Sequence, residues 1–169
     1  VTDTKGAIYD GRVDINDRNP YKKEISINTN IRKLSGTLQD VISESDIFIG
    51  VSGKTDILNK QMIQSMDQDS IIFALSNPDP EILPNYALEY GARIVATGRS
   101  DFPNQINNAV VFPSILRALL DLRANNLNEL MLVSVAYAIA SIVEEVHLKD
   151  DYIIPKVDDP RILPIVTKT

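Results

Sequence analysis

Three short apolar runs, separated by segments of helical character, constrain the fold of this chain more than any other feature. The runs are DIFIGV at residues 46–51, SIIFAL at residues 70–75 and RIVA at residues 93–96. Such near-continuous apolar runs are typical of strands in a parallel sheet that is covered on both faces. The alternation of strand and helix predicts an α/β fold in which right-handed crossovers make these strands parallel neighbours.

Cap residues and apolar spacing predict the helices. Thr37 can cap a helix that reaches about residue 43, and Asn59 can cap a second one. Further helices are predicted at residues 84–90, at residues 112–122, at residues 128–146, and from Asp159 and Pro160 onward.

The remaining segments are predicted to be irregular or extended. Residues 1–3 are expected to end a strand and run into a turn, and residues 152–155 to be extended. Residues 10–33 are polar and carry turn signals, so we expect a loop there with a single helical turn near residues 20–25.

Charge and composition exclude several classes of function. The net charge of -6, with basic residues scattered among acidic ones, argues against nucleic acid as a partner, because phosphate binding needs clustered Lys and Arg. The absence of Cys excludes disulfides and thiolate metal sites and fits a cytoplasmic location. His147 alone cannot build a histidine-rich metal site, so we expect it to be structural or exposed. Residues 130–143, the most apolar run, are too short to span a bilayer, so no membrane partner is expected.

Ligands of open α/β sheets bind beyond the carboxyl ends of the strands, which directs attention to the segments that follow the three runs. Ser52 and Gly53 follow the first run, where small residues allow close approach of the backbone to a ligand but also suit a plain tight turn. Asn77 follows the second run and offers both a donor and an acceptor. In the same turn, Asp79 and Glu81 form either a carboxylate pair or, as we favour, an acidic turn that caps the next helix.

The third segment, TGRSDFPNQINN at residues 97–108, is unusually rich in amides. Its amides, Asn107 and Asn108 included, can bind a carboxylate, a hydroxyl or a carboxamide by neutral hydrogen bonds; a surface loop that satisfies its own backbone is the alternative. Arg99 can pair with an anion or with Asp101.

Asp3 is a fourth candidate. An acid at the end of the second strand of a dinucleotide fold accepts hydrogen bonds from the adenosine ribose and disfavours a 2′-phosphate. The G-x-G-x-x-G turn that should precede it by about 20 residues is not in this sequence. We therefore expect a sheet that lacks its first strand and its Gly-rich loop.

Four segments together carry a resemblance to a known family. They are VTDTKGAIYDGR at residues 1–12, DIFIGVSGKTDILNKQMIQSM at residues 46–66, SIIFALSNPDPEI at residues 70–82 and ARIVATGRSDFPNQINNAVVFPSILRALLDLRA at residues 92–124. The chain resembles the malic enzymes of the short prokaryotic type, specifically the C-terminal part of their NAD-binding domain. This implies a Rossmann-like, doubly wound, mostly parallel sheet with flanking helices. Ser114 departs from the family, which usually has Gly at that position.

The resemblance also implies an activity and site residues. Malic enzymes oxidise L-malate to pyruvate and CO2 with NAD or NADP, and with Mg or Mn. The residues that match the family's cofactor-binding positions are Asp3 at the adenosine ribose, Ser52 and Gly53 along the dinucleotide, Asn77 at the nicotinamide ribose, and Thr97 and Gly98 around the nicotinamide. Those that match its substrate-binding positions are Asn77, Asn107 and Asn108.

The family's catalytic Lys and Tyr and its acidic metal ligands belong N-terminal to the matched region. We therefore assign no catalytic residue and no metal ligand to this chain, and we expect it to be an inactive piece of the enzyme. Residues 1–124 are expected to form a partial NAD(P)-binding domain, and residues 125–169 a C-terminal helical segment that packs on the same domain.

The expected partners are L-malate or pyruvate and the missing N-terminal region of the same enzyme, in a homo-oligomer. Two alternatives are a non-catalytic NAD-binding module and another NAD-dependent oxidoreductase of the amino-acid dehydrogenase type.

Overall fold

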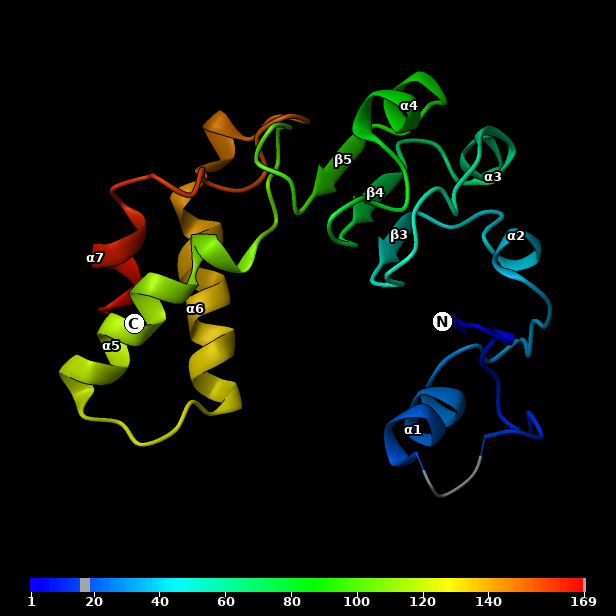
Figure 1. Ribbon diagram of the computed structural model, residues 1–169, viewed down its shortest axis with the longest axis horizontal. Helices are drawn as coiled ribbons and strands as arrows, with labels where there is room; N and C mark the ends of the chain where they lie inside the picture. The colour runs from blue at the N-terminus through cyan, green and yellow to red at the C-terminus, as the bar shows by residue number, and fades with distance from the viewer. Residues whose placement is uncertain (16–18, 169) are drawn as a thin grey trace.

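A three-stranded parallel sheet lies between the C-terminal helices and the N-terminal region in the computed structural model, which describes residues 1–15 and 19–168 (Figure 1). Its strands, in order across the sheet, are β3 (Ile47–Gly50), β4 (Ile71–Ala74) and β5 (Ile94–Thr97). Both pairings are parallel, which confirms the predicted topology. Each strand begins and ends one residue away from its predicted bounds.

Three short helices cover one face of this sheet. They are α2 (Leu38–Val41), α3 (Lys60–Ser65) and α4 (Pro84–Glu89). Thr37 and Asn59 are the caps, as predicted: Thr37 shares a capping box with Asp40, and the Asn59 side chain accepts from the Met62 N–H. Helix and strand side chains form one buried cluster of Ile42, Phe48, Leu58, Met62, Ile63, Met66, Ile72, Ala74, Ile82, Ala87, Ala92 and Val95.

The opposite face of the sheet is more exposed within the described residues. Side chains alternate along a strand, so Phe48 points into the buried cluster while Ile47 and Ile49 point the other way. The side chain of Ile47 is 52% exposed and that of Ile49 is 61% exposed. The described helices beside β3 therefore bury mainly one of its two faces.

The N-terminal region differs from the prediction in one respect. Strands β1 (Thr2–Asp3) and β2 (Gly6–Ala7) pair antiparallel in a hairpin, in agreement with the expected strand end and turn. The helical turn expected near residues 20–25 is present but longer than predicted, because α1 (Pro20–Asn28) is a helix of nine residues. Asn19 caps it through the Lys22 N–H at 3.0 Å, and Pro20 fits its first turn. Residues 16–18 of the expected loop lie outside the described residues.

Three further helices form a second group beside the sheet (Figure 1). They are α5 (Phe112–Leu122), α6 (Glu129–Ile142) and α7 (Ile162–Val166), and 3-10 turns η1 (Asn108–Val110) and η2 (Glu145–His147) flank them. Their buried cluster consists of Val110, Val135, Ile139, Ile142, Ile162 and Val166. Ser114 is buried within α5, which continues without a break.

The ends of two of these helices differ from the predictions. Helix α6 ends at Ile142 rather than at residue 146. Helix α7 begins at Ile162, two residues later than predicted, and the Asp159 carboxylate accepts from the Arg161 N–H, at 2.9 Å, just before it. The division of the chain between residues 124 and 125 stays a prediction. Helix α5 comes before this boundary in the sequence, yet it packs against α7, which comes after it. Among residues 1–15 and 19–168, none of the helices has the length and apolar character that crossing a membrane requires.

Replacement of Ile72 tests the assignment of the two sheet faces. Ile72 is 0% exposed, whereas Ile49 on the neighbouring strand is 61% exposed. We expect Ile72→Ala to lower the free energy of unfolding of the chain by about 2–5 kcal/mol, because it leaves a cavity in the core. Ile49→Ala is the matched control and should cost clearly less. Urea denaturation followed by circular dichroism measures both, and equal losses would contradict the assignment.

Candidate functional site

The loops that follow β3, β4 and β5 begin side by side at one edge of the sheet. The strand register aligns Gly50 with Ala74 and Ala74 with Thr97, and the Leu75 N–H donates to the Gly50 carbonyl at 3.0 Å. The carboxyl ends of parallel strands thus meet at this edge, where ligands of such sheets bind.

A buried carboxylate, that of Glu81, joins the first two loops. Glu81 is 0% exposed and lies against Gly50, where a Cβ would overlap the carboxylate. Its Oε1 accepts from the Ser52 N–H at 2.9 Å, the Ser52 hydroxyl at 2.9 Å and the Ser76 hydroxyl at 2.5 Å. Its Oε2 accepts from the Ser76 N–H at 3.1 Å. The carboxylate therefore ties the two loops together by four hydrogen bonds.

Both readings of the acidic turn are wrong for Glu81. Asp79 is exposed and lies 3.6 Å from Arg99, so it forms no carboxylate pair with Glu81. Helix α4 begins after Leu83 without a side-chain cap, so Glu81 does not cap it. One signal was present in the sequence: Ser52 and Ser76 each stand two residues after the aligned strand ends.

Two opposing effects set the charge of Glu81. Burial disfavours the charged form and raises the pKa, whereas hydrogen bonds from Ser76 and Ser52 stabilise the carboxylate and lower the pKa. The pKa of Glu81 lies below its ordinary value as a result. Glu81 is therefore ionised at neutral pH and only accepts hydrogen bonds.

The hydrogen-bond donors of Ser52 and Gly53 point toward the second loop, whereas the Cα of Gly53 lies on the outer side of its own loop. The Gly53 N–H donates to the Ser76 hydroxyl at 2.8 Å. Gly53 has a φ of +68°, and nothing lies within 4 Å of the position that a Cβ would take. The loop therefore offers an open backbone surface beside the sheet edge.

Asn77, Thr97 and Gly98 come together where the second and third loops begin. A Cβ on Gly98 would lie 3.2 Å from both Asn77 Oδ1 and Asn77 Nδ2, so Gly98 allows the Asn77 amide to pack against the backbone. Thr97 is 0% exposed, and its hydroxyl accepts from the Arg99 N–H at 3.2 Å. The Gly98 carbonyl accepts from the Asn107 amide at 2.9 Å.

The three residues predicted to bind substrate line one cavity of about 650 Å³. Asn77 lies at its sheet side, and Asn107 and Asn108 lie at the start of η1. Most of the other lining side chains are apolar: Leu75, Ile106, Val110, Val111, Phe112, Ile115, Leu127, Leu132 and Ile154. An apolar cavity with a few convergent amides is the usual form of a small-molecule site.

The amides of residues 97–108 have different tasks. Asn104 is 6% exposed and holds the chain together: its amide donates to the carbonyls of Val95 and Asp150, and its Oδ1 accepts from the Ile153 N–H. Asn107 caps η1 through the Ala109 N–H as well as bonding Gly98. The Asn108 side chain has no hydrogen-bond partner among the described residues. It is therefore free to bind a ligand.

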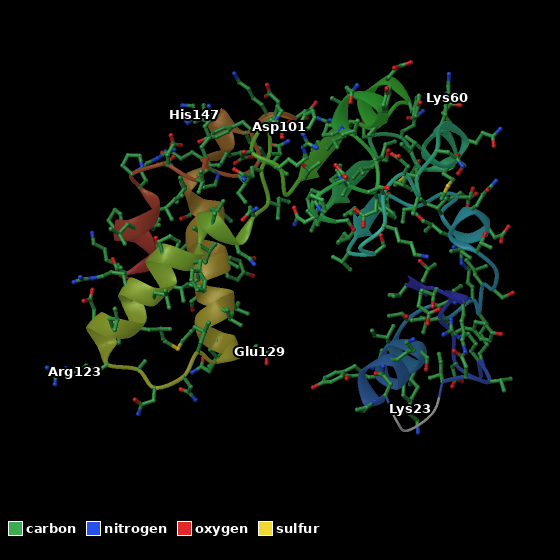
Figure 2. All side chains as sticks on the ribbon, viewed as in Figure 1. Lys23, Lys60, Asp101, Arg123, Glu129 and His147 are labelled. Atoms are coloured by element: carbon green, nitrogen blue, oxygen red, sulfur yellow. The ribbon has the colours of Figure 1, made fainter. Side chains whose placement is uncertain are left out.

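Charged side chains near this loop are either paired or exposed. Arg99 forms a bidentate ion pair with Asp101, at 2.7 Å for the shorter contact, which agrees with one of its two predicted roles. Figure 2 shows Asp101 on the segment between β5 and the helical group, and His147 at the surface.

Asp3 lies in the N-terminal hairpin, apart from the amide-lined cavity. Its Oδ1 accepts from the Lys5 N–H at 2.9 Å and from Arg12 at 3.0 Å, and its Oδ2 from Arg12 at 2.6 Å and Lys22 at 2.7 Å. The hydrogen bonds from Arg12 hold the pKa of Asp3 well below its ordinary range against the effect of burial, with further lowering by Lys22. All four acceptor positions of the carboxylate are therefore used.

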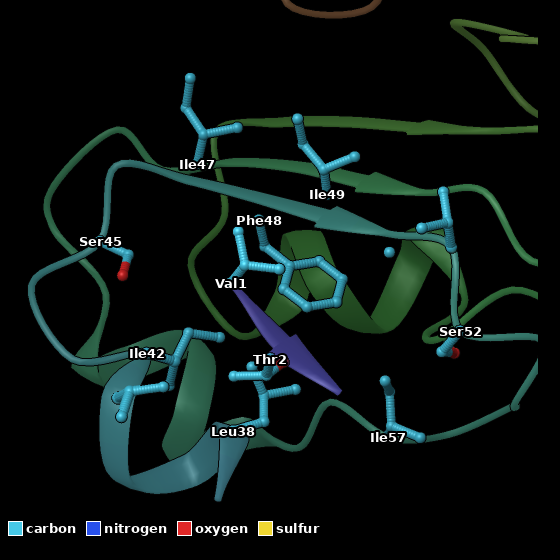
Figure 3. Close-up of a pocket in the computed structure, with 13 residues that line it drawn as sticks. Val1, Thr2, Leu38, Ile42, Ser45, Ile47, Phe48, Ile49, Ser52 and Ile57 are labelled. Carbon is cyan, nitrogen blue, oxygen red and sulfur yellow. The ribbon is translucent and has the colours of Figure 1, made fainter. Parts of the chain in front are cut away.

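An apolar groove of about 430 Å³ lies between β1, β3 and α2. Figure 3 shows Val1 and Phe48 among the residues that line this groove, with Leu38 and Ile42 on the side of α2. Ser52 is the one predicted site residue among those that line it. Because no charged side chain lines the groove, it is suited to apolar packing rather than to chemistry.

Comparison with known proteins gives a family match and close relatives. The family model described as "Malic enzyme, NAD binding domain" matches residues 1–165. A bifunctional malic/malolactic enzyme of Bacillus subtilis (strain 168) is 51% identical over 168 residues, which cover 99% of this chain and 40% of the relative. An NADP-dependent malic enzyme of Rhizobium meliloti (strain 1021) is 41% identical over 98% of this chain and 23% of its own length.

A solved structure agrees with these relatives. The NAD-dependent malic enzyme of Thermotoga maritima superposes with a TM-score of 0.88 at 39% sequence identity, over 99% of this chain and 43% of that one. The fold is therefore that of the NAD-binding domain of these enzymes. The chain spans less than half the length of the relatives that it matches.

Replacement of Asp3 tests its role in stability. We expect Asp3→Asn to lower the free energy of unfolding at pH 7 by about 2 kcal/mol, because Arg12, with its side chain 8% exposed, loses one of its two carboxylate partners and keeps only Asp14, at 2.7 Å. The folded pKa of Asp3 is depressed, so its stabilisation is present above the unfolded value of about 4 and is lost as the pH falls below it. The difference between wild type and variant should therefore shrink at pH 3.

The matched control is Asp10→Asn, since Asp10 pairs with Lys33 at 3.3 Å with both side chains exposed. It should cost less than about 1 kcal/mol at either pH. Urea denaturation at pH 7 and pH 3 measures both variants. A loss for Asp3→Asn that does not change with pH would show that its charge is not the cause.

Proposed function

This chain belongs to the malic enzyme family, and from that premise we propose that it is the part of an NAD-dependent malic enzyme that binds the cofactor and the substrate. The proposed reaction is oxidative decarboxylation of L-malate to pyruvate and CO2. The observation that carries the proposal is the convergence of Asn77, Asn107 and Asn108 on one apolar cavity beyond the strand ends. The activity belongs to the longer enzyme, of which the chain spans a part.

The residues present fit a dinucleotide. Gly53 leaves open space at the sheet edge, and Gly98 allows the Asn77 amide to lie against the backbone. We propose that Ser52 and Gly53 follow the dinucleotide, that Thr97 and Gly98 close around its nicotinamide, and that Asn77 binds the nicotinamide ribose. The bound cofactor supplies the acceptor for the hydride that leaves C2 of malate.

Asp3 is proposed to face the adenosine ribose. Its carboxylate has no unused acceptor position, so a ribose hydroxyl must take the place of one present donor. Lys22 is more exposed than Arg12, the other charged donor, so we propose that the ribose hydroxyl replaces Lys22. NAD is the cofactor that an acid at this position favours, and NADP is the alternative, since relatives of both kinds match the chain.

The substrate side rests on the amides. Asn77 and Asn108 donate neutral hydrogen bonds to malate carboxylate oxygens in the proposed complex, while Asn107 is held by η1 and by the Gly98 carbonyl. The apolar lining of the cavity lowers the local polarity around these hydrogen bonds, which strengthens them. No residue of this chain is assigned as the base that takes the malate hydroxyl proton.

The Mg or Mn of the family does not fit the described part of this chain. Residues 1–15 and 19–168 contain no group of three or more His, Cys, Asp or Glu side chains arranged to hold a metal ion. We therefore derive no step through the metal and propose that other parts of the enzyme bind it. A cytoplasmic location and a homo-oligomeric state belong to the same proposal.

The activity of the longer enzyme tests this proposal. With L-malate, Mn and NAD, we expect absorbance at the wavelength of NADH to rise with equal amounts of pyruvate formed, and a lower kcat/KM with NADP. The isolated chain should show no turnover, because it lacks an assigned base. A longer enzyme that binds NAD but never oxidises malate would instead support the non-catalytic module. Turnover by the isolated chain would contradict the division of roles.

Two asparagines of one loop provide a matched test of the substrate site. Asn108→Ala should raise KM for malate about tenfold with little change in melting temperature, because its free amide is proposed to bind the carboxylate. Asn104→Ala should instead lower the melting temperature, because it removes three hydrogen bonds made by a buried side chain. Steady-state kinetics and thermal denaturation distinguish them. An unchanged KM for malate in Asn108→Ala would remove Asn108 from the substrate site.

A further inference from the structure

The buried Glu81 has no part in the chemistry described above, yet it is hydrogen-bonded to two of the loops at the site. We propose that Glu81 is a positioning residue for cofactor binding, because its carboxylate fixes the orientation of the loop of residues 52–54. The inference rests on the proposed function, since it concerns the same cofactor surface.

The direction of two hydroxyl groups follows from the chemistry of a carboxylate. An ionised carboxylate only accepts hydrogen bonds, so a hydroxyl that reaches it donates its proton. The Ser76 hydroxyl lies 2.5 Å and the Ser52 hydroxyl 2.9 Å from Glu81 Oε1. These charged contacts are stronger than the neutral one of 3.3 Å between the Ser52 hydroxyl and the Lys54 carbonyl. Both hydroxyls therefore point their protons at Glu81 and their lone pairs away from it.

Those lone pairs receive backbone N–H groups of the loop. The Gly53 N–H donates to the Ser76 hydroxyl at 2.8 Å, and the Lys54 N–H donates to the Ser52 hydroxyl at 3.1 Å. The Ser52 N–H donates to Glu81 itself at 2.9 Å. Three consecutive N–H groups thus turn toward one carboxylate, either directly or through a single hydroxyl. The loop conformation depends on the charge of a residue 29 positions away from Ser52.

The opposite side of this loop is the proposed cofactor surface. With its N–H groups turned inward, the loop directs the open side of Gly53 outward, where nothing lies within 4 Å of a Cβ position. Glu81 itself is fully buried and does not reach that surface. Its effect on the cofactor is therefore indirect, through the shape of the loop.

Glutamine is the informative replacement because it keeps the size of Glu81 and removes the charge. The amide NH2 of glutamine donates where the carboxylate oxygen accepts. An NH2 at the Oε2 position leaves the Ser76 N–H without its acceptor. An NH2 at the Oε1 position leaves the Ser52 N–H and both serine hydroxyls without theirs. A Ser76 hydroxyl that reverses to accept from the amide is less able to accept from the Gly53 N–H. We expect a folded protein whose loop is misplaced.

The test is Glu81→Gln in the longer malic enzyme. Calorimetric titration with NAD gives Kd, and steady-state kinetics give KM for NAD, KM for malate and kcat. We expect Kd and KM for NAD to rise about tenfold, with kcat at saturating NAD reduced less than about threefold. Ser76→Ala should also raise Kd for NAD, and the double variant should not exceed Glu81→Gln, because both changes act through the same hydroxyl.

Two controls separate positioning from a general loss of stability. Asp79→Asn removes the exposed acid of the same turn and should leave Kd for NAD unchanged. Ile72→Val removes a methyl group from the buried cluster, which lowers the melting temperature, and it should also leave Kd for NAD unchanged. The inference is overturned if Kd for NAD does not change in Glu81→Gln, or if Ile72→Val raises it as much at an equal loss of melting temperature.

A Glu81→Gln enzyme that does not fold leaves Ser76→Ala as the deciding variant. An increase in its Kd for NAD then supports the inference, and an unchanged Kd overturns it. A wild-type enzyme that fails to bind NAD or to oxidise malate overturns the proposed function instead, so the two failures are distinguishable.

Discussion

The shared register of three parallel strands is the constraint on which the rest of this structure depends. Because Gly50, Ala74 and Thr97 are aligned, the residues that follow them meet at one edge of the sheet. Ser52 and Ser76 stand at equal distances from their strand ends and so reach the same buried carboxylate. A slip of one residue in either pairing would turn each side chain to the other face of the sheet and separate these groups.

The sequence predicted the strands more accurately than the helix ends or the charged network. Buried strands leave a short continuous apolar run, and each run marked its strand to within one residue. The length of helix α1 was underestimated because the helix is polar and buries only Ser26, so it has no apolar stripe to detect. Glu81 was misread because an acid in a proline-rich turn is usually solvated. Only strand pairing brings it to Ser52, 29 residues away.

The amide-rich loop illustrates a second limit of sequence reasoning. Asn104, Asn107 and Asn108 are the same residue type within five positions, yet one is structural, one caps a turn and one has a free side chain. The difference lies in contacts with Asp150 and Ile153, which local composition does not reveal. Residues that stay free after the fold has satisfied its own backbone are the better candidates for ligand binding.

The exposed sheet face has a consequence for the protein during its synthesis. Ile47 and Ile49 of β3 and Val51 just beyond its end are β-branched residues, and all three are more than half exposed. In a newly made chain, such a strand can associate with the same strand of another molecule. Asp46 and Lys54 bracket this apolar stretch with opposite charges, and charged flanking residues of this kind oppose aggregation.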